Sequence, residues 1–289
     1  MPIRSLNREL EAARDAGPVK DIVIPPCPQL LVQLQTELAQ ADPNPQRVAE
    51  IAGGDVAMAA ALIKVANSSL YARREPVHSV AQAINMLGVK PTASILTGFL
   101  LRNAIRIDPT LIEHFWESST RRSLAMAHIA GEMYGLDMDV CKTCGLFFHV
   151  GIPVMLQGVR GYSGTLVEAM ARQDRTFVQT ENAAHRTDHA VVGAIVAKTW
   201  HLPAEVVYAV RLHHDFSSLT DSHVPLQVRQ LVAIAAIADH LVARHEGVKD
   251  QREWEKYGAQ CLAFLQIGAE EVEIWGDELY PVFEGVIVA

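Results

Sequence analysis

Histidines and cysteines are the residues of this chain whose types and spacing suggest chemistry. Cys141 and Cys144 form a single CxxC motif, and His149 follows it closely. Such a set is typical of a zinc site or a redox pair. The sequence has no second CxxC motif, and a thioredoxin-like redox pair would need βαβ units. We therefore interpret both cysteines as small apolar residues on one buried helix face.

Three residues that could bind a metal or transfer a proton lie together farther on, at His213-His214-Asp215.

Other familiar reactive motifs are absent from the sequence. The glycine-rich stretch 158–164 lacks the Lys-Ser/Thr pair of a phosphate-binding loop and does not follow a strand. We interpret it as a flexible connection. No nucleophilic serine stands in the glycine-flanked turn of a hydrolase.

Helical periodicity predicts the elements that must position these side chains. Asn44 and Asp55 are expected N-caps, Ser79 with Gln82 an expected capping box, and Gly88 a helix stop. In the second half we predict helices over 111–134, 141–148, 166–172, 176–186, 188–200, 204–214, 226–245, 253–265 and 270–283. The alternation of a half-buried strand is absent from the sequence. The predicted fold class is all-α.

Prolines suggest how the chain is divided. Pro25, Pro26 and Pro28 forbid helix and predict a rigid, extended segment. Asp108-Pro109 marks a second break. We predict an N-terminal helix or tail over 1–20, an N-terminal helical lobe over 21–107, and a second helical lobe over 108–289.

Composition excludes some classes of protein. The formal net charge of −8 repels nucleic acid and anionic lipid overall, so we expect neither partner. Two arginine pairs, Arg73-Arg74 and Arg121-Arg122, are interpreted as solvated helix faces. No apolar run approaches the ~20 residues of a membrane span, and the N-terminus does not resemble a signal peptide. Four cysteines without a disulfide framework predict a cytoplasmic location.

Several short motifs together resemble the HDOD family. They are the Pro-Pro-x-Pro segment, Asp55 with its helix and an Ala-Asn-Ser triplet, the Leu-Gly helix end, Phe-Trp, Gly145 to Gly151, the Asp-His-Ala-Val-Val-Gly run and Leu-Pro. Their order agrees over about residues 22–216. The positions that carry the resemblance are Pro26, Asp55, Asn67, Ser68, Leu87, Gly88, Trp116, Gly151, Asp188, Gly193 and Pro203.

The resemblance implies an all-α fold of two helical lobes, the second a degenerate relative of the HD metal-dependent phosphohydrolases. Those enzymes need a first histidine, a His-Asp pair and a later aspartate. Here the pair is His149-Val150, and valine cannot bind a metal. The first histidine falls at Ser118, within one residue, and the later aspartate at Asp239. Related cyclic-di-GMP phosphodiesterases carry a Gly-Tyr-Pro triplet after a pair such as His213-His214, and it is absent here.

Two interpretations of the remaining site stay open. The histidines are helix-packing residues and no cofactor is expected, or they hold a residual divalent metal. The residues concerned are His149, His189, His213, His214 and Asp239. We assign no catalytic residue.

The resemblance also implies a regulatory protein of bacterial signalling, in cyclic-di-GMP or two-component pathways. We expect a non-catalytic module that binds a protein partner. One alternative is a phosphohydrolase with an altered HD site. Another is a sensor that binds a nucleotide or small anion in the old pocket. The sequence does not determine the partner or the oligomeric state.

Overall fold

The computed structural model describes residues 3–15, 17–71, 76–105, 114–133 and 135–286. These residues form helices and loops, with no strand among them. The all-α prediction is therefore confirmed. The predicted boundary near residue 107 and the pair Arg73-Arg74 lie outside the described residues.

The chain divides into two compact units, each made of two segments. The major unit comprises residues 1–25 and 107–276, and the minor unit comprises residues 26–106 and 277–289. The predicted lobes follow one another along the chain, whereas each compact unit also contains a segment from the opposite end of the chain. The first 25 residues join the second helical lobe, and the last 13 join the first.

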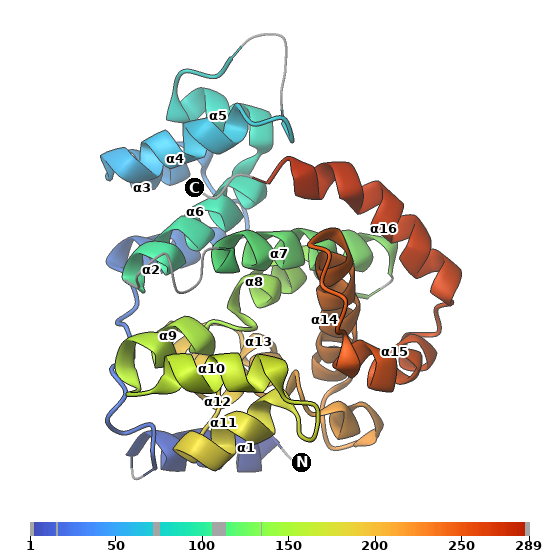
Figure 1. Ribbon diagram of the computed structural model, residues 1–289. Helices are drawn as coiled ribbons and strands as arrows, with labels where there is room; N and C mark the ends of the chain where they lie inside the picture. Colours follow the sequence, from blue (N-terminus) through green and yellow to red (C-terminus); the bar gives the residue numbers. More distant parts are fainter. Residues whose placement is uncertain (1–2, 16, 72–75, 106–113, 134, 287–289) are drawn as a thin grey trace. The chain divides into compact units, whose positions relative to one another are not determined.

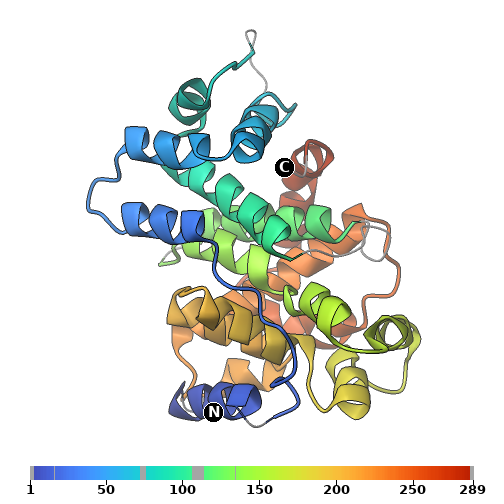
Figure 2. The ribbon, with the colours of Figure 1, turned by 90° about the vertical axis from the view of Figure 1, so that its left-hand side faces the viewer.

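The minor unit is built around α6, which packs against the other helices of residues 29–87. Its helices are α2 (Gln29–Leu38), α3 (Pro45–Gly53), α4 (Val56–Ala66), α5 (Val80–Leu87) and α6 (Val89–Ala104). Helices α2 and α3 lie beside α6 (Figure 2). Leu34, Leu62 and Leu96 are fully buried between them.

Caps determine where these helices begin and end, as the sequence predicts. Asn44 and Asp55 accept hydrogen bonds from backbone N–H groups in the first turns of α3 and α4. Ser79 does the same for α5, but Gln82 accepts from the backbone N–H of His78 instead of closing the expected capping box. Gly88 ends α5 at a positive φ of 87°.

The major unit contains the elements that carry the candidate site. Its helices are α1 (Ile3–Asp15), α7 (Phe115–Glu132), α8 (Met138–Phe147), α9 (Gly151–Gly158), α10 (Tyr162–Ala171), α11 (Phe177–His185), α12 (His189–Thr199), α13 (Ala204–Leu212), the short 3-10 helix η2 (Phe216–Thr220), α14 (Leu226–His245) and α15 (Arg252–Leu265). Helix α16 (Ala269–Glu284) begins in this unit and ends in the minor unit. Helices α7, α8 and α14 pack side by side (Figure 1).

Two parts of this unit differ from the sequence prediction. Helix α9 was not predicted, and it fills a stretch between two expected helices. The stretch 158–164 is not a flexible connection, because α10 begins at Tyr162 and the Tyr162 side chain is fully buried. Only residues 159–161 connect the two helices, with Gly161 at a positive φ of 81°.

Two stretches are long and apolar enough to cross a membrane by length and composition, contrary to the sequence prediction. They are Met138–Gly158 and Leu226–His245. More than half of each is buried inside the helical structure, at 61% and 56%. The core helices of a folded domain meet the same criteria, so they are weak evidence for a membrane span.

Candidate metal centre

A close contact between two helices brings His149 to His189. Helix α9 packs on α12, and a Cβ atom at Gly151 would lie 1.9 Å from the carbonyl oxygen of His189. Only glycine allows this approach. At Gly193 a Cβ atom would meet the Val150 side chain at 3.4 Å. Gly151 and Gly193 therefore allow the turn that carries His149 to lie against the start of α12, where His189 is the first residue.

Helix α12 is oriented at its first turn. Asp188 is the N-cap and accepts a hydrogen bond from the Val191 backbone N–H at 2.9 Å. The amide of Asn182 donates to the other oxygen of Asp188 at 2.6 Å. At the far end of the helix, the buried Trp200 indole donates to the carbonyl oxygen of Pro25 at 2.9 Å. These three hydrogen bonds hold the helix that presents His189.

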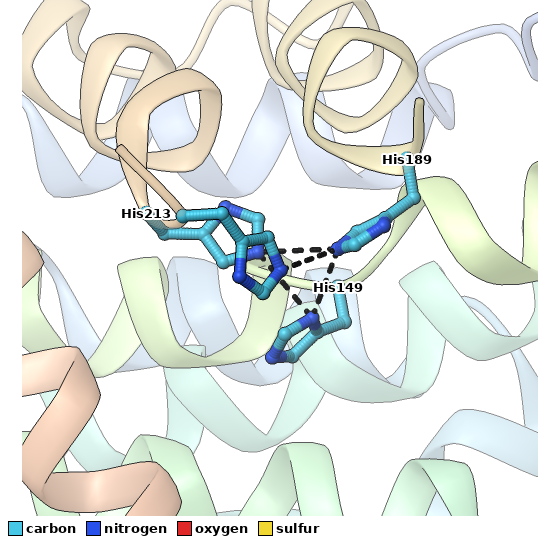
Figure 3. Close-up of side chains that lie close together, drawn as sticks. His149, His189 and His213 are labelled. Atoms are coloured by element: carbon cyan, nitrogen blue, oxygen red, sulfur yellow. Dashed lines mark hydrogen bonds between the residues drawn. The ribbon is translucent and has the colours of Figure 1, made fainter. Parts of the chain in front are cut away.

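The structure places His149, His189, His213 and His214 around one centre. One nitrogen from each ring lies within 4.8 Å of the others. Nδ1 of His149 is 3.3 Å from Nε2 of His189, which is 3.3 Å from Nε2 of His213 and 3.0 Å from Nε2 of His214. Figure 3 shows three of these rings pointing toward one another from separate parts of the chain. We call these four residues the histidine cluster.

The other nitrogen of each ring meets an acceptor outside the cluster. Nδ1 of His189 lies 2.7 Å from the buried Glu181 carboxylate, and Nδ1 of His214 lies 2.8 Å from Glu253. Nδ1 of His213 lies 2.6 Å from the carbonyl oxygen of Val210, which can only accept. For His149, Nε2 lies 3.4 Å from Asp239.

These partners determine the tautomers of the neutral rings. We call the ring nitrogen that faces the other histidines the inner nitrogen, and the one that faces an acceptor the outer nitrogen. A neutral ring that donates through its outer nitrogen has a lone pair on its inner nitrogen. Burial and the nearby Arg122 guanidinium lower the pKa of His149 to about 3, and burial with the neighbouring rings lowers the pKa of His213 well below its usual range. The inner nitrogens of neutral rings therefore face one another with lone pairs, an arrangement that a cation would stabilise.

The pKa of His214 is shifted in the opposite direction from those of His149 and His213. Burial lowers the pKa of His214, but the adjacent Glu253 carboxylate, together with Asp239 and Glu181, outweighs burial and raises that pKa above its usual value. Burial likewise raises the pKa of Glu253, and the contact with His214 outweighs it and lowers the pKa. This pair resembles the carboxylate–histidine arrangements that orient metal ligands in proteins.

The donor set fits a transition metal. Zinc binds imidazole nitrogen at about 2.0–2.1 Å, so the nitrogens of a tetrahedral site lie about 3.3 Å apart. Three pairs of inner nitrogens in the histidine cluster are separated by close to this distance, at 3.3, 3.3 and 3.4 Å, and a fourth pair by 3.0 Å. The chemistry and spacing of these residues therefore suit one divalent ion.

Asp239 is close to the histidine cluster but is held away from its centre. One carboxylate oxygen accepts a hydrogen bond from Nε of Arg122, and the other faces the outer nitrogen of His149. Burial raises the pKa of Asp239, but the Arg122 guanidinium and His149 outweigh it and hold that pKa below its usual range. Arg122 is itself buried, so its interpretation as part of a solvated helix face is wrong.

The two positions that depart from the HD pattern also have defined places. Val150 is fully buried in the turn before α9. Ser118 lies on the first turn of α7, where its hydroxyl donates to Glu246 at 2.6 Å. Ser118 lines a pocket with His149, His189 and His214, so this position faces the site although its side chain is a weak ligand.

No remaining motif position belongs to the histidine cluster, and several of them end helices or bind the backbone. Asn67 exchanges two hydrogen bonds with the backbone of Val77, at 2.7 and 2.8 Å. Pro203 precedes the first turn of α13, and Trp116 packs edge-on against Phe115. Pro26 follows the anchored Pro25, Ser68 is buried, and Leu87 and Gly88 end α5.

The cysteines do not take part in the histidine cluster. Cys141 and Cys144 are free and buried in α8, and no cysteine belongs to the metal-capable group found among the described residues. Burial raises the pKa of the Cys141 thiol to about 12. Protonated thiols are poor ligands and nucleophiles, which supports the interpretation of both as packing residues.

Sequence reasoning missed the residues that surround the rings. Glu181, Glu253 and Arg122 belong to no motif, and their role depends on α7, α11 and α15 folding onto the histidine cluster. The helices that carry these three residues contain many other polar residues, so no signal in the sequence singled them out. Such residues are common on exposed helix faces.

Solved structures share this fold at low sequence identity. A candidate phosphohydrolase from Shewanella amazonensis SB2B is 17% identical, with a TM-score of 0.71 over 96% of this chain and 95% of its own. A candidate signal transduction protein from Marinobacter aquaeolei VT8 is 18% identical, with a TM-score of 0.72 over 96% of this chain and 64% of its own. An HDOD domain protein of unknown function from Geobacter sulfurreducens is 20% identical, with a TM-score of 0.69 over 95% of this chain and 92% of its own.

One curated relative also matches over most of the chain. It is an uncharacterized protein of Treponema pallidum (strain Nichols), 21% identical over 273 residues. These residues cover 93% of this chain but only 51% of the relative, so the chain spans about half the relative's length. The profile of the HDOD domain family matches residues 24–216, which is more than half of the sequence. The chain therefore belongs to the HDOD domain family.

Proposed function

We propose that this chain is a signalling module whose histidine cluster holds one divalent transition metal, and that it does not hydrolyse phosphate esters. One observation carries the proposal. Four imidazoles, two of them buried (His189 and His213) and two partly exposed (His149 and His214), direct one nitrogen each toward a common centre, while the opposite nitrogens face acceptors. Packing alone does not require this orientation of four rings.

The donor set favours a closed site over a catalytic one. Imidazole suits zinc, copper and nickel, and four protein ligands complete the shell of a structural zinc. A hydrolytic metal centre needs an open position for the water that becomes hydroxide. Here the extra carboxylate, Asp239, is held by Arg122. A bound metal would supply a fixed positive charge that ties α9, α12 and α13 together.

The signalling part of the proposal is supported by the family and by a structural relative. That relative is named as a candidate signal transduction protein. We propose that the metal-loaded module contacts a protein partner in such a pathway. The rigid helices around the histidine cluster would present the contact surface.

Metal analysis of protein purified without added metal tests the first part. We expect about one zinc, or one cobalt after exchange, per chain, and cobalt absorption bands of tetrahedral coordination. His213→Ala should weaken metal binding at least about tenfold. His223→Ala is the matched control, because His223 is exposed, pairs with Asp221 and does not belong to the histidine cluster. Wild-type protein that binds neither metal stoichiometrically would contradict the proposal.

A panel of phosphate esters and cyclic dinucleotides tests the absence of hydrolysis. We expect no turnover by the metal-loaded protein. Turnover that His213→Ala abolishes and His223→Ala retains would support the phosphohydrolase alternative instead.

The partner is tested by a pull-down from the native host with the metal-loaded chain, repeated in the reciprocal direction. Failure to retain any protein reproducibly counts against the interaction role.

A further inference from the structure

A pocket of about 230 Å³ opens beside the histidine cluster. Its lining residues are Phe115, Ser118, Arg122, His149, Ile152, Phe177, His189 and His214. Three of these are apolar, and they come from α7, α9 and α11. Pockets for drug-sized ligands measure about 300–1,000 Å³. This one therefore suits a smaller molecule than a nucleotide or cyclic dinucleotide.

Arg122 gives the pocket its one fixed positive charge. The residue is only 7% exposed, and its Nε donates to Asp239. Its Nη1 is buried and has no hydrogen-bond partner among the described residues. A guanidinium has five N–H donors in a rigid fork that matches phosphate and carboxylate oxygens. A ligand rich in acceptors would satisfy donors that the protein leaves open.

The charges around the pocket make anion binding conditional on the metal. Three carboxylates surround the rings, from Glu181, Asp239 and Glu253, against the single guanidinium. A divalent ion in the histidine cluster would balance the two remaining negative charges. The metal-free pocket would therefore repel an anion, and the loaded pocket would accept one.

We propose that the metal-loaded pocket binds a small phosphate monoester. Its phosphate oxygens accept from Arg122 beside the metal, and its organic group lies against Phe115, Ile152 and Phe177. The apolar walls are the reason to choose an ester over free phosphate. This inference rests on the proposed metal site, and it identifies the ligand class to which the module would respond.

Isothermal titration with phenyl phosphate and with inorganic phosphate tests the proposal. Each is added to zinc-loaded and to chelator-treated protein, with metal content measured separately. We expect phenyl phosphate to bind the zinc-loaded protein at least about tenfold more tightly than inorganic phosphate does, because its ring becomes buried. Removing zinc should weaken phenyl phosphate binding at least about tenfold.

Variants of Arg122 test whether this residue binds phenyl phosphate. Arg122→Gln should weaken phenyl phosphate binding about 10- to 100-fold, as expected for losing a charge-assisted hydrogen bond, with zinc content unchanged. Arg122→Lys keeps a positive charge for Asp239 but loses the fork, so about tenfold weaker binding is expected. Arg121→Gln is the matched control, because Arg121 pairs with Glu246 and does not line the pocket.

Each failure has a distinct meaning. Zinc-loaded protein that binds neither phosphate compound overturns this inference and leaves the metal site standing. Equal binding of both compounds overturns the choice of an ester. Undiminished binding by Arg122→Lys and Arg122→Gln removes Arg122 from the site, and if the glutamine variant does not fold, the lysine variant decides. A wild-type chain without metal overturns the proposed function as well.

Discussion

The two units of this protein use buried polar side chains in different ways. In the minor unit, the buried polar residues among those described are Ser68 and Thr92. Asn44, Asp55 and Asn67 hydrogen-bond to the backbone there. The major unit buries Arg122, Glu181, His189 and His213, and these converge on one point.

The difference shows where the sequence serves something other than stability. Burying ionisable groups costs free energy unless each is paired, and apolar residues of similar size are often as stable or more so. The minor unit has an apolar core and avoids the free-energy cost of burying ionisable groups. The major unit keeps a histidine cluster with carboxylate partners, and we infer that a ligand offsets that cost.

The largest expected effect follows from removing Glu181. Glu181→Leu leaves Tyr162 Oη–H and the Nδ1–H of His189 without their acceptor in a fully buried place. We expect the free energy of unfolding to fall by about 3–5 kcal/mol, since each buried donor without a partner costs about 1–3 kcal/mol. Urea unfolding of the metal-free protein measures it. A loss below about 1 kcal/mol would show that the network does not hold the major unit.

Glu181→Gln separates stability from metal binding. It keeps an acceptor for His189 but removes the negative charge. We expect metal affinity to fall about 10- to 100-fold, the usual effect of changing an outer partner of a ligating histidine. Competition with a chelator measures the affinity, and unchanged affinity would exclude Glu181 from the metal site.

Acid should destabilise the metal-free major unit before the carboxylates titrate. His149 has a folded-state pKa of about 3, below its unfolded value of about 6.5, and the pKa of His213 is also lowered. Between these pH values the unfolded chain binds protons that the folded chain does not. Stability is therefore lost as pH falls below about 6.5, by up to about 1.4 kcal/mol per pH unit for each histidine that stays neutral.

The raised pKa of His214 opposes this effect in part. Urea unfolding between pH 7.5 and 5 in the presence of a chelator measures the balance. His149→Gln should flatten the pH dependence, and a wild-type curve that is flat over this range would contradict the expected neutral rings.

A smaller effect is expected in the minor unit for a cap. Asp55→Ala removes the acceptor for the Met58 backbone N–H and should lower the free energy of unfolding by about 1 kcal/mol. Zinc content should stay the same, because Asp55 belongs to the unit without the histidine cluster. Altered zinc stoichiometry would show that the units are coupled.

The smallest effect is expected for Thr92→Val. The Thr92 hydroxyl is fully buried and has no hydrogen-bond partner among the described residues. Valine has nearly the same shape without the polar group, so stability should rise by up to about 1 kcal/mol. Thermal unfolding checks this. A loss would show that the hydroxyl has a partner, and it would weaken the contrast between the units.

Local features of the sequence determined much of the helical framework. Asn44, Asp55 and Gly88 define helix ends through contacts within a few residues, so they could be predicted without the fold. The expected helix over 226–245 has the bounds of α14. Helix α9 and the start of α10 were missed because Pro153 and the glycines around 158–164 signal a loop locally. The buried ring of Tyr162 shows that tertiary packing overrides that signal.

The sequence by itself determined an all-α chain with four histidines at positions typical of a degenerate HD site. Only the tertiary structure decided what surrounds them. Glu181, Glu253 and Arg122 lie far from most of these histidines along the chain, and the close approach at Gly151 brings His149 to His189. Helical periodicity acts over a few residues, whereas the tautomer, charge and direction of a ring depend on partners from other helices. For that reason the residues of the histidine cluster could be named from the sequence, and its inward-facing nitrogens could not.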